Sequence, residues 1–333
     1  MIKVANLPTE ERRILFLNTG EKIGMHPSIV EKDFWVCYML GYLFERCLWK
    51  DSFVFKGGTS LSKAYHVINR FSEDIDLIMD WRLIDYDINQ PWEMRSKTQQ
   101  DKLNKRMNVE AEIFLKDIFL PQLISDLHKE LNTVPQICIE KEGNEAIVNF
   151  AYPQINRDIY LRPEIRMEIG PLAEWTPSHF QNVKSFVAEQ YSDVFDAPEA
   201  AVRTVDIERT FWEKITILHK VANRQGGKSV PHRYARHYYD VFCMCKTDIK
   251  QRALDKKELL AQDIAFKSKF YYSKGAAYET AKIGTLQLLP NEDGIRQLAD
   301  DYEHMKNMIY GEIPHFSNIV KSLRLLEEEI NKS

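Results

Sequence analysis

The stretch FVFKGGTSLSKAYHVINRFSEDIDLIM at residues 53–79 combines two short apolar runs with a glycine pair and an acid pair. Each apolar run predicts a strand, and the residues after Gly57 and Gly58 predict a helix between the two strands. Asp74 and Asp76 open the second run, and side chains two positions apart in a strand point to the same face. The pattern therefore predicts that both carboxylates face the glycine turn before the helix.

The acid pair is a candidate metal site. Neighbouring carboxylates repel each other and are costly to keep ionised without a cation. Mg²⁺ or Mn²⁺ prefers carboxylate and phosphate oxygens, and a glycine turn at a helix N-terminus presents backbone N–H groups to phosphate. We therefore expect Asp74 and Asp76 to hold a divalent metal, and Gly57 and Gly58 to contact the phosphates of a nucleoside triphosphate. The alternative is a solvated strand end, because most carboxylates are exposed.

The helix after the turn carries further candidate nucleotide-binding groups. The hydroxyls of Thr59 and Ser60 can donate to phosphate and can also cap the helix. Lys63 lies one turn into the helix and can reach a triphosphate as a point charge.

A second acid, Glu168, lies in the short apolar run IRMEIG at residues 165–170. Alternation along a strand places Arg166 and Glu168 on one face. From a separate strand that faces the same side, Glu168 is a candidate third metal ligand. The alternative is an ion pair with Arg166 or Arg162, because exposed charges on strands commonly pair.

Composition places the chain among ordinary globular proteins. Of its 333 residues, 44% are hydrophobic and 28% charged, and the formal net charge of −4 gives no global attraction to nucleic acid. The five cysteines are scattered, which favours a reducing compartment. The first residues lack the apolar core of a signal peptide, and no run reaches the length of a membrane span. We expect a cytoplasmic protein without a membrane partner.

The patterns along the chain predict an α+β fold with a soft boundary near residue 200. Pro27 and Ser28 followed by Glu31 predict a helix start with a capping box, and residues 92–131 predict a long helical stretch that Pro121 kinks or divides. Short runs at 134–139, 146–152, 158–161 and 165–169 predict strands. Beyond residue 200, helical periodicity predicts helices around 211–222, 234–242, 249–262, 294–309 and 316–331.

Residues 219–237 are locally basic in an acidic chain. The segment contains Arg224, Arg233 and Arg236, together with histidines and lysines. One interpretation is a solvated loop with helix-end cations. The other is a clamp for a triphosphate or an RNA backbone, in which Arg236 binds the nucleotide. The residue types suit both.

The order of motifs resembles the AbiEii/AbiGii toxin nucleotidyltransferases, including the MenT-like enzymes, of the DNA polymerase β-like nucleotidyltransferase superfamily. KGGTSLSKAY followed by RFSEDIDL resembles the first motif of that family, and IVEKDFWV at 29–36 resembles its N-terminal helix. IRMEIG, ERTFWEKITILH at 208–219 and RYARHYYDVF at 233–242 resemble its third-carboxylate strand, its lysine-bearing helix and its Arg- and Asp-containing motif. The matches run from about residue 29 to 245.

The resemblance implies a nucleotidyltransferase-like mixed sheet flanked by helices over residues 1–200, and a helical domain over 201–333 that completes the active-site cleft. It implies that Asp74 and Asp76 are metal ligands, that Lys214 contacts the nucleotide phosphates and that Asp240 is a catalytic or structural acid. Solvated or structural roles for Lys214 and Asp240 are the alternatives.

The resemblance also implies a toxin of a toxin–antitoxin or phage-defence pair. Such an enzyme would transfer a nucleoside monophosphate from an NTP to an RNA acceptor with Mg²⁺, the acceptor in MenT-like relatives being the tRNA 3′ end, and would have a cognate antitoxin protein. One alternative is an NTP-binding interaction protein that acts by sequestration. Another is an adenylyltransferase that acts on a protein or a small molecule.

Overall fold

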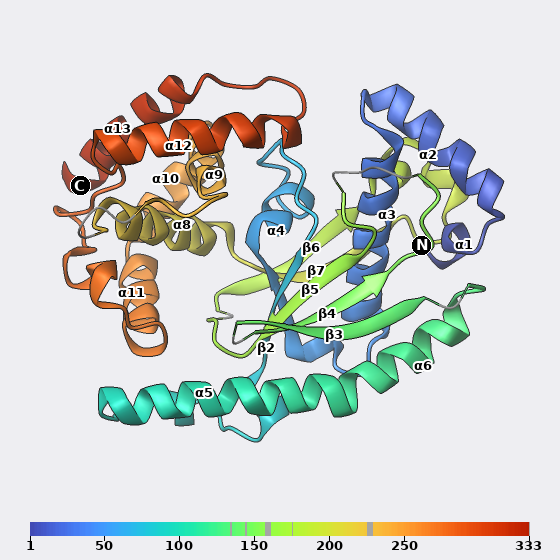
Figure 1. Cartoon of the computed structure of the whole chain (residues 1–333), viewed down its shortest axis with the longest axis horizontal. Helices are drawn as coiled ribbons and strands as arrows, with labels where there is room; N and C mark the ends of the chain where they lie inside the picture. Colours follow the sequence, from blue (N-terminus) through green and yellow to red (C-terminus); the bar gives the residue numbers. More distant parts are fainter. Residues whose placement is uncertain (134, 144, 157–160, 175, 225–228, 333) are drawn as a thin grey trace. The chain divides into compact units, whose positions relative to one another are not determined.

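The computed structural model describes residues 1–133, 135–143, 145–156, 161–174, 176–224 and 229–332 (Figure 1). The chain divides into two compact units. Unit 1 comprises Met1–Ala64 and Ser72–Val205, and unit 2 comprises Tyr65–Phe71 and Asp206–Ser333. The short segment Tyr65–Phe71 therefore belongs to unit 2, although in the sequence it separates two elements of unit 1.

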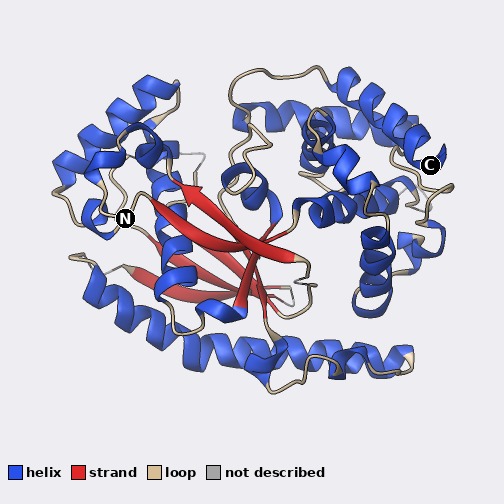
Figure 2. Ribbon diagram, turned by 180° about the vertical axis from the view of Figure 1, so that it is seen from behind, coloured by secondary structure: helices blue, strands red, loops and turns tan. Residues whose placement is uncertain are grey.

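Unit 1 is built on a seven-stranded sheet of order β3-β4-β5-β2-β1-β7-β6 (Figure 2). The β1–β7 and β2–β5 pairs are parallel and the other pairs antiparallel, so the sheet is mixed. The predicted α+β class is confirmed. The strands are β1 Phe53–Lys56, β2 Ile75–Met79, β3 Gln136–Glu142, β4 Glu145–Ala151, β5 Ile165–Gly170, β6 Ser178–Lys184 and β7 Glu199–Val205.

Three helices pack on the strands of this sheet: α3 (Pro27–Gly41), α5 (Lys97–Phe114) and α6 (Leu120–Glu130). Phe53 of β1 contacts Phe119 at the start of α6, and Phe150 of β4 contacts Trp35 of α3. The strand register places Phe53 and Phe150 on the same face, because directly opposite residues share a face and side chains alternate along a strand. The side chains of Asp76 and Glu168 alternate with this face and therefore lie on the opposite one.

The helices of unit 1 follow the sequence order. They are α1 Ile2–Ala5, α2 Thr9–Ile23, α3 Pro27–Gly41, α4 Gly57–Lys63, α5 Lys97–Phe114, α6 Leu120–Glu130 and α7 Phe186–Gln190. A π-helical turn, η5 Leu115–Phe119, separates α5 from α6, and Pro121 lies in the first turn of α6. Proline lacks an N–H and crowds the carbonyl four residues earlier, so the helix widens at this point. The predicted division at Pro121 is confirmed.

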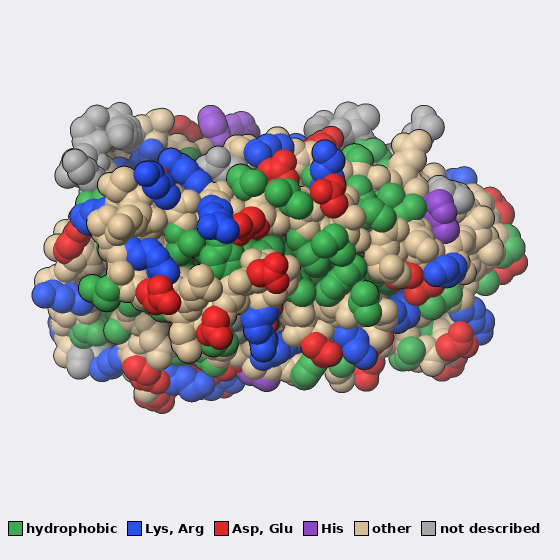
Figure 3. Space-filling model, turned by 90° about the horizontal axis from the view of Figure 1, so that it is seen from below, with side chains coloured by type: hydrophobic (Ala, Val, Ile, Leu, Met, Phe, Trp, Pro, Cys, Tyr) green, Lys and Arg blue, Asp and Glu red, His purple; other side chains and the backbone are tan. Residues whose placement is uncertain are grey.

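Helix α5 shows why the long stretch is helical and where it is buried. Met107, Ala111 and Phe114 are buried, whereas Val109 and Ile113 are about 51% and 52% exposed. Figure 3 shows the face seen from below, the side on which α5 lies in Figure 1, where hydrophobic side chains gather among charged ones. The helix therefore buries one stripe and leaves a smaller apolar group at the surface.

The sequence predictions for unit 1 differ from the structure in several places. Strands β6 and β7 were not predicted. The sequence of β6, SHFQNVK, lacks apolar alternation. The predicted run at 158–161 lies largely outside the described residues, as does residue 134. The predicted capping box at the start of α3 is wrong. His26 is the N-cap, and Glu31 is fully buried, where its carboxylate accepts from the N–H groups of Ile155 and Asn156, both at 2.7 Å.

Unit 2 is helical. Its helices are α8 Ile207–Ala222, α9 Ala235–Cys245, α10 Ile249–Leu254, α11 Glu258–Phe270, α12 Glu292–Met305 and α13 Phe316–Lys332. The helix predicted over 249–262 is two helices, whereas the others match within a few residues. Tyr65–Phe71 joins this unit through backbone bonds from Phe71 N to Met308 O (2.7 Å) and from Tyr310 N to Asn69 O (2.9 Å).

Within the described residues, no helix combines the length and the apolar character that crossing a membrane requires.

Candidate active site

The acid pair and the glycine turn meet in unit 1. Gly57 has a φ of +83°, and a Cβ atom built on it would lie 1.8 Å from Oδ2 of Asp76. Only glycine adopts this backbone conformation without strain and leaves room for the carboxylate. The sequence prediction that the carboxylate faces the glycine turn is confirmed for Asp76.

Asp76 lies in a row of charged residues across neighbouring strands. Lys56 of β1 is its antiparallel partner, and Glu168 of β5 is its parallel partner. Opposite residues of paired strands share a face, so Lys56, Asp76 and Glu168 project from the same side of the sheet. The prediction that Glu168 comes from a separate strand on the same side is confirmed. Lys56 was not identified in the sequence, because its place in the row depends on strand pairing.

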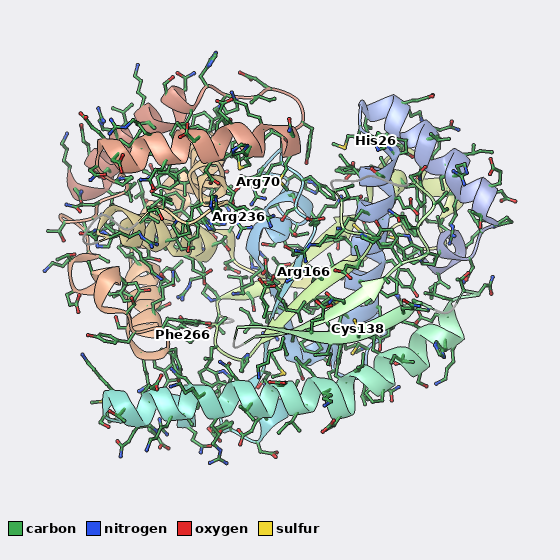
Figure 4. All side chains as sticks on the ribbon, viewed as in Figure 1. His26, Arg70, Cys138, Arg166, Arg236 and Phe266 are labelled. Carbon is green, nitrogen blue, oxygen red and sulfur yellow. The ribbon has the colours of Figure 1, made fainter. Side chains whose placement is uncertain are left out.

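Arg166 lies among the acids of this face (Figure 4). Its Nε atom is 3.9 Å from Asp74 Oδ1, and its Nη2 atom is 4.0 Å from Glu168 Oε1 and 2.6 Å from Glu142 Oε2. The ion pair of Arg166 with Glu168 that the sequence offered as an alternative is thus present as a long contact. Its shortest contact is with Glu142, so Arg166 only partly neutralises the other two acids.

Asp74 has an electrostatic environment that disfavours its charged form. Burial raises the pKa of Asp74, and the negative charges of Glu73 and Asp76 raise it further, whereas Arg166 and Lys32 oppose this shift. The net pKa of Asp74 is raised above its usual value of 3.8. Negative charge is therefore left in excess on this face.

The donor set fits a magnesium ion that arrives with phosphates. In the part of the chain that the structure describes, no three His, Cys, Asp or Glu side chains form a ready metal-binding group. Mg²⁺ is usually held by one or two carboxylates, with phosphates and water as its other ligands, rather than by a cage of protein groups. Asp76 and Glu168 provide hard oxygen donors at adjacent positions, and a cation there would relieve the repulsion at Asp74.

Thr59 and Ser60 hold the backbone around the turn. Both side chains are fully buried. The hydroxyl of Thr59 donates to the carbonyl of Asp74 at 2.5 Å, and that of Ser60 donates to the carbonyl of Gly57 at 2.8 Å. The predicted capping role is wrong, because α4 begins at Gly57 with Lys56 as its N-cap and both hydroxyls lie inside the helix. The bond from Thr59 fixes the start of β2 against α4.

Lys63 is bound inside unit 1. It is 4% exposed, its Nζ atom lies 2.7 Å from Oδ1 of Asp33, and it sits over the ring of Phe186 at 4.0 Å. Burial alone would lower the pKa of Lys63, but the charge of Asp33 raises it, and the net pKa is raised. The ammonium is thus charged and occupied by a carboxylate of α3.

Three consecutive charged residues of α3 each hold a different segment of unit 1. Glu31 binds the backbone at residues 155–156, as described above. Lys32, 1% exposed, forms an ion pair with Glu73 and donates to the carbonyl of Arg162 at 2.9 Å. Asp33 accepts from the N–H of Phe186 at 2.7 Å in addition to its pair with Lys63. Lys32 thereby fixes the residue just before Asp74.

One motif in the sequence indicates this network. The motif IVEKDFWV places three charges between apolar and aromatic residues in one helix. A charged residue is seldom fully buried unless it is paired, so three in succession on a buried helix indicate three separate partners.

In unit 2, Asp240 is the centre of a buried charged cluster. It accepts from Arg70 Nε at 2.7 Å, from Arg70 Nη2 at 2.9 Å and from Lys214 Nζ at 2.9 Å. Lys214 Nζ also lies 3.2 Å from Nδ1 of His237. Asp240 is fully buried, and Arg70 and Lys214 are 4% and 6% exposed. The sequence pointed to Lys214 and Asp240, but it gave no sign that Arg70, 170 residues away, completes the group.

The charges of this cluster are dominated by cations. Burial alone would raise the pKa of Asp240, but Arg70 and Lys214 lower it, and the net pKa is lowered. Burial lowers the pKa of Lys214, and Arg70 and Arg236 lower it further against the opposing effect of Asp240. Burial and the charge of Lys214 lower the pKa of His237, which favours the neutral ring. Positive charge is therefore left in excess here.

Comparisons with known proteins agree with the motifs. A family model described as "Nucleotidyl transferase AbiEii toxin, Type IV TA system" matches residues 40–322, which extends well past the last motif recognised in the sequence. Among solved structures, MenT4, a nucleotidyltransferase toxin from Mycobacterium tuberculosis H37Rv, is 14% identical, with 94% of this chain and 98% of that chain covered and a TM-score of 0.41. No curated protein matches. The matched range contains every motif quoted above except IVEKDFWV at 29–36, and it covers most of the chain: the chain belongs to the AbiEii nucleotidyltransferase toxin family of type IV toxin–antitoxin systems and is a nucleotidyltransferase.

Proposed function

We propose that this protein transfers a nucleoside monophosphate from an NTP to the 3′ end of tRNA in the cytoplasm, with Mg²⁺ and with release of pyrophosphate. The observation that carries the proposal is the row of acids beside Gly57, in which Asp76 and Glu168 project from one side of two parallel strands. Few other protein groups are needed for nucleotidyl transfer, because it depends mainly on positioning and on neutralising phosphate charge.

The acids hold the metal in this proposal. Asp76 and Asp74 are the principal ligands, and Glu168 is a third. A cation held there would supply positive charge against the charge that develops on the transferred phosphoryl group. The backbone N–H groups of Gly57 and Gly58 contact the phosphates in this proposal, since neither residue has a side chain of its own that would block a close approach to the backbone.

The helix after the turn supports this arrangement. Thr59 and Ser60 fix the turn and the start of β2 through their bonds to backbone carbonyls. Lys63 contributes through its pair with Asp33, which ties α4 to α3. We propose these three as nucleotide-positioning residues that act through the backbone of the turn.

Lys214, Asp240 and Arg236 are proposed on the basis of their motifs and charges. Lys214 contacts the nucleotide phosphates and Arg236 adds positive charge, whereas Asp240 orients Lys214 through the 2.9 Å bond between them. Burial lowers the pKa of Lys214, and a phosphate beside its Nζ atom would oppose this shift.

We propose the acceptor and the partner on the basis of the family and of the motif resemblance. A type IV toxin–antitoxin system implies a cognate antitoxin protein, and the resemblance to MenT-like enzymes favours an RNA acceptor. The role in phage defence is proposed on the same basis.

A transfer assay tests the proposal. The protein is incubated with each α-³²P-labelled NTP, Mg²⁺ and total tRNA, and label on RNA is measured. We expect labelled tRNA with the native chain and a loss of about 10³-fold in Asp76→Asn, because several kcal/mol of charge stabilisation are removed. Glu140→Gln is the matched control, since Glu140 is an exposed acid on β3 of the same sheet. Label that is unchanged in Asp76→Asn contradicts the proposal, and label on protein instead of RNA supports the adenylyltransferase alternative.

Sequestration is the second candidate. It predicts that the Asp74→Ala/Asp76→Ala double variant still arrests growth when expressed. Two mutually repelling acids beside Gly57 are unnecessary for sequestration and required for metal-dependent transfer, so we expect the double variant to be harmless.

A further inference from the structure

Unit 2 contains a cavity with a basic lining. Its volume is about 220 Å³, and three arginines, Arg70, Arg233 and Arg236, line it together with His304. Figure 4 labels Arg70 and Arg236 in this unit. A pocket for a whole drug-sized ligand measures roughly 300 Å³ or more, so this cavity suits a smaller group.

Asp301, the acid in the lining, is occupied by the backbone. Its Oδ1 accepts from the N–H of Arg233 at 2.6 Å, and its Oδ2 accepts from the N–H of Ala235 at 2.8 Å. The two oxygens thus hold the turn that leads into α9. Because both carboxylate oxygens of Asp301 accept from backbone N–H groups, the arginine side chains of the lining do not depend on Asp301 as a partner in these bonds.

Arg233 is held in an unusual conformation by this contact. Its φ is +65°, a left-handed backbone that costs energy for a residue with a side chain. Such conformations persist where the surrounding structure enforces them and are frequent at ligand-binding positions. Here the enforcing group is Asp301, and the result is an arginine side chain in the lining of the cavity.

The remaining charges also favour an anion. Arg70 donates to Asp240 through Nε and Nη2, and its Nη1 takes no part in that pair. Asp240 also accepts from Lys214. One buried carboxylate thus serves two buried cations, while Arg233 and Arg236 add charge at the cavity. The apolar part of the lining, Met305 and Met308, reduces solvation and strengthens the attraction of an anion.

We propose that this cavity is a phosphate-binding site. Guanidinium groups bind phosphate through planar, paired N–H donors, and several arginines around a small cavity match the three or four oxygens of one phosphate group. The source of the phosphate rests on the proposed function: it is either a phosphate of the NTP or a phosphodiester of the RNA acceptor. The existence of the site does not depend on it.

Binding is tested without catalysis. Inorganic pyrophosphate is titrated calorimetrically, in EDTA, into the full chain that carries Asp76→Asn, so that neither metal nor transfer contributes. In that background Arg233→Asn removes the guanidinium, and asparagine tolerates the left-handed backbone and retains the N–H that Asp301 binds. The control is Arg296→Gln, an exposed arginine of α12 whose contact is with Asp293.

We expect Arg233→Asn to weaken pyrophosphate binding about tenfold, which corresponds to loss of one charge-assisted contact, and Arg296→Gln to leave it unchanged. Equal affinity in Arg233→Asn and its parent, or no binding at millimolar pyrophosphate, overturns the site. Since this readout needs no transfer, it holds even if the proposed reaction proves wrong.

The source is decided by steady-state transfer with Arg233→Asn in the otherwise native chain. A raised KM for tRNA with an unchanged KM for NTP assigns the cavity to the RNA backbone. A raised KM for NTP with an unchanged KM for tRNA assigns it to the triphosphate. If neither KM changes, the assignment to a substrate of this reaction is overturned.

Discussion

The acid row of unit 1 and the Asp240 cluster of unit 2 have opposite charge balance. At the acid row, Glu73 and Asp76 raise the pKa of Asp74, and Arg166 is shared among several carboxylates. At Asp240, two cations lower the pKa of one carboxylate, and Arg236 adds to the positive excess. Carboxylates thus favour the binding of a cation in the first region, and a carboxylate stabilises buried cations of the protein in the second.

The largest expected effect is on stability, from Asp240→Asn. The substitution leaves Arg70 and Lys214 buried without a counter-charge, which costs about 3–5 kcal/mol. Urea unfolding of the full chain measures it. Asp76→Asn is the counterpart in the other region, and we expect it to change the unfolding free energy by less than about 0.5 kcal/mol, because it removes a repelled charge. Equal losses of unfolding free energy in Asp240→Asn and Asp76→Asn would contradict the predicted difference between the two regions.

The glycine turn is tested by Gly57→Ala. A Cβ at this position would overlap the Asp76 carboxylate and force a positive φ on alanine, so we expect a loss of about 1–3 kcal/mol in unfolding free energy together with loss of transfer. Gly170→Ala is the matched control, because Gly170 lies on β5 and nothing lies within 4 Å of its added Cβ. Native transfer rates in Gly57→Ala would show that transfer does not require the Asp76 carboxylate to lie beside Gly57.

Lys32 is expected to affect both the stability of unit 1 and the pKa of Asp74. Lys32→Met removes the partner of Glu73 and costs about 1.5–3 kcal/mol, the range for a hydrogen bond to a charged group. It also removes a charge that opposes the raised pKa of Asp74. The pKa of Asp74, followed by carboxyl ¹³C NMR, should therefore rise further. An unchanged pKa of Asp74 in Lys32→Met would mean that Lys32 does not act on Asp74 through its charge.

The smallest effect is a difference in pH dependence between the two regions. Asp74 has a raised pKa in the folded state, so its ionisation destabilises the fold, and stability falls as pH rises through the window above 3.8. Asp240 has a lowered pKa, so its stabilisation is present above 3.8 and is lost as pH falls through the lower folded value. Unfolding free energies are measured between pH 3 and 7. As pH rises, the unfolding free energy of the native chain should fall relative to that of Asp74→Asn and should rise relative to that of Asp240→Asn. Parallel pH curves would contradict the assigned signs.

The local parts of this picture could be predicted from sequence. The β1–α4–β2 unit, the Asp76 approach to Gly57 and the helices of unit 2 follow from short-range periodicity and from glycine placement. The position of Arg166 beside Glu168 follows from alternation along one strand, whereas that of Lys56 beside Asp76 depends on strand pairing, and the pairing of Arg70 with Asp240 spans 170 residues. Strand β6 was missed because it lies at the sheet edge and buries only Val183, so its sequence carries no apolar alternation.

The central claim, that the acid row binds a divalent cation together with an NTP, is tested most directly by Mn²⁺ binding. Electron paramagnetic resonance measures Mn²⁺ bound to the full chain in the presence of a non-hydrolysable NTP analogue, for the native protein, Asp76→Asn and the control Glu140→Gln. We predict that the native chain and Glu140→Gln bind Mn²⁺ only with the analogue present, and that Asp76→Asn weakens this binding at least tenfold. Equal Mn²⁺ affinity in Asp76→Asn and the native chain would contradict the account.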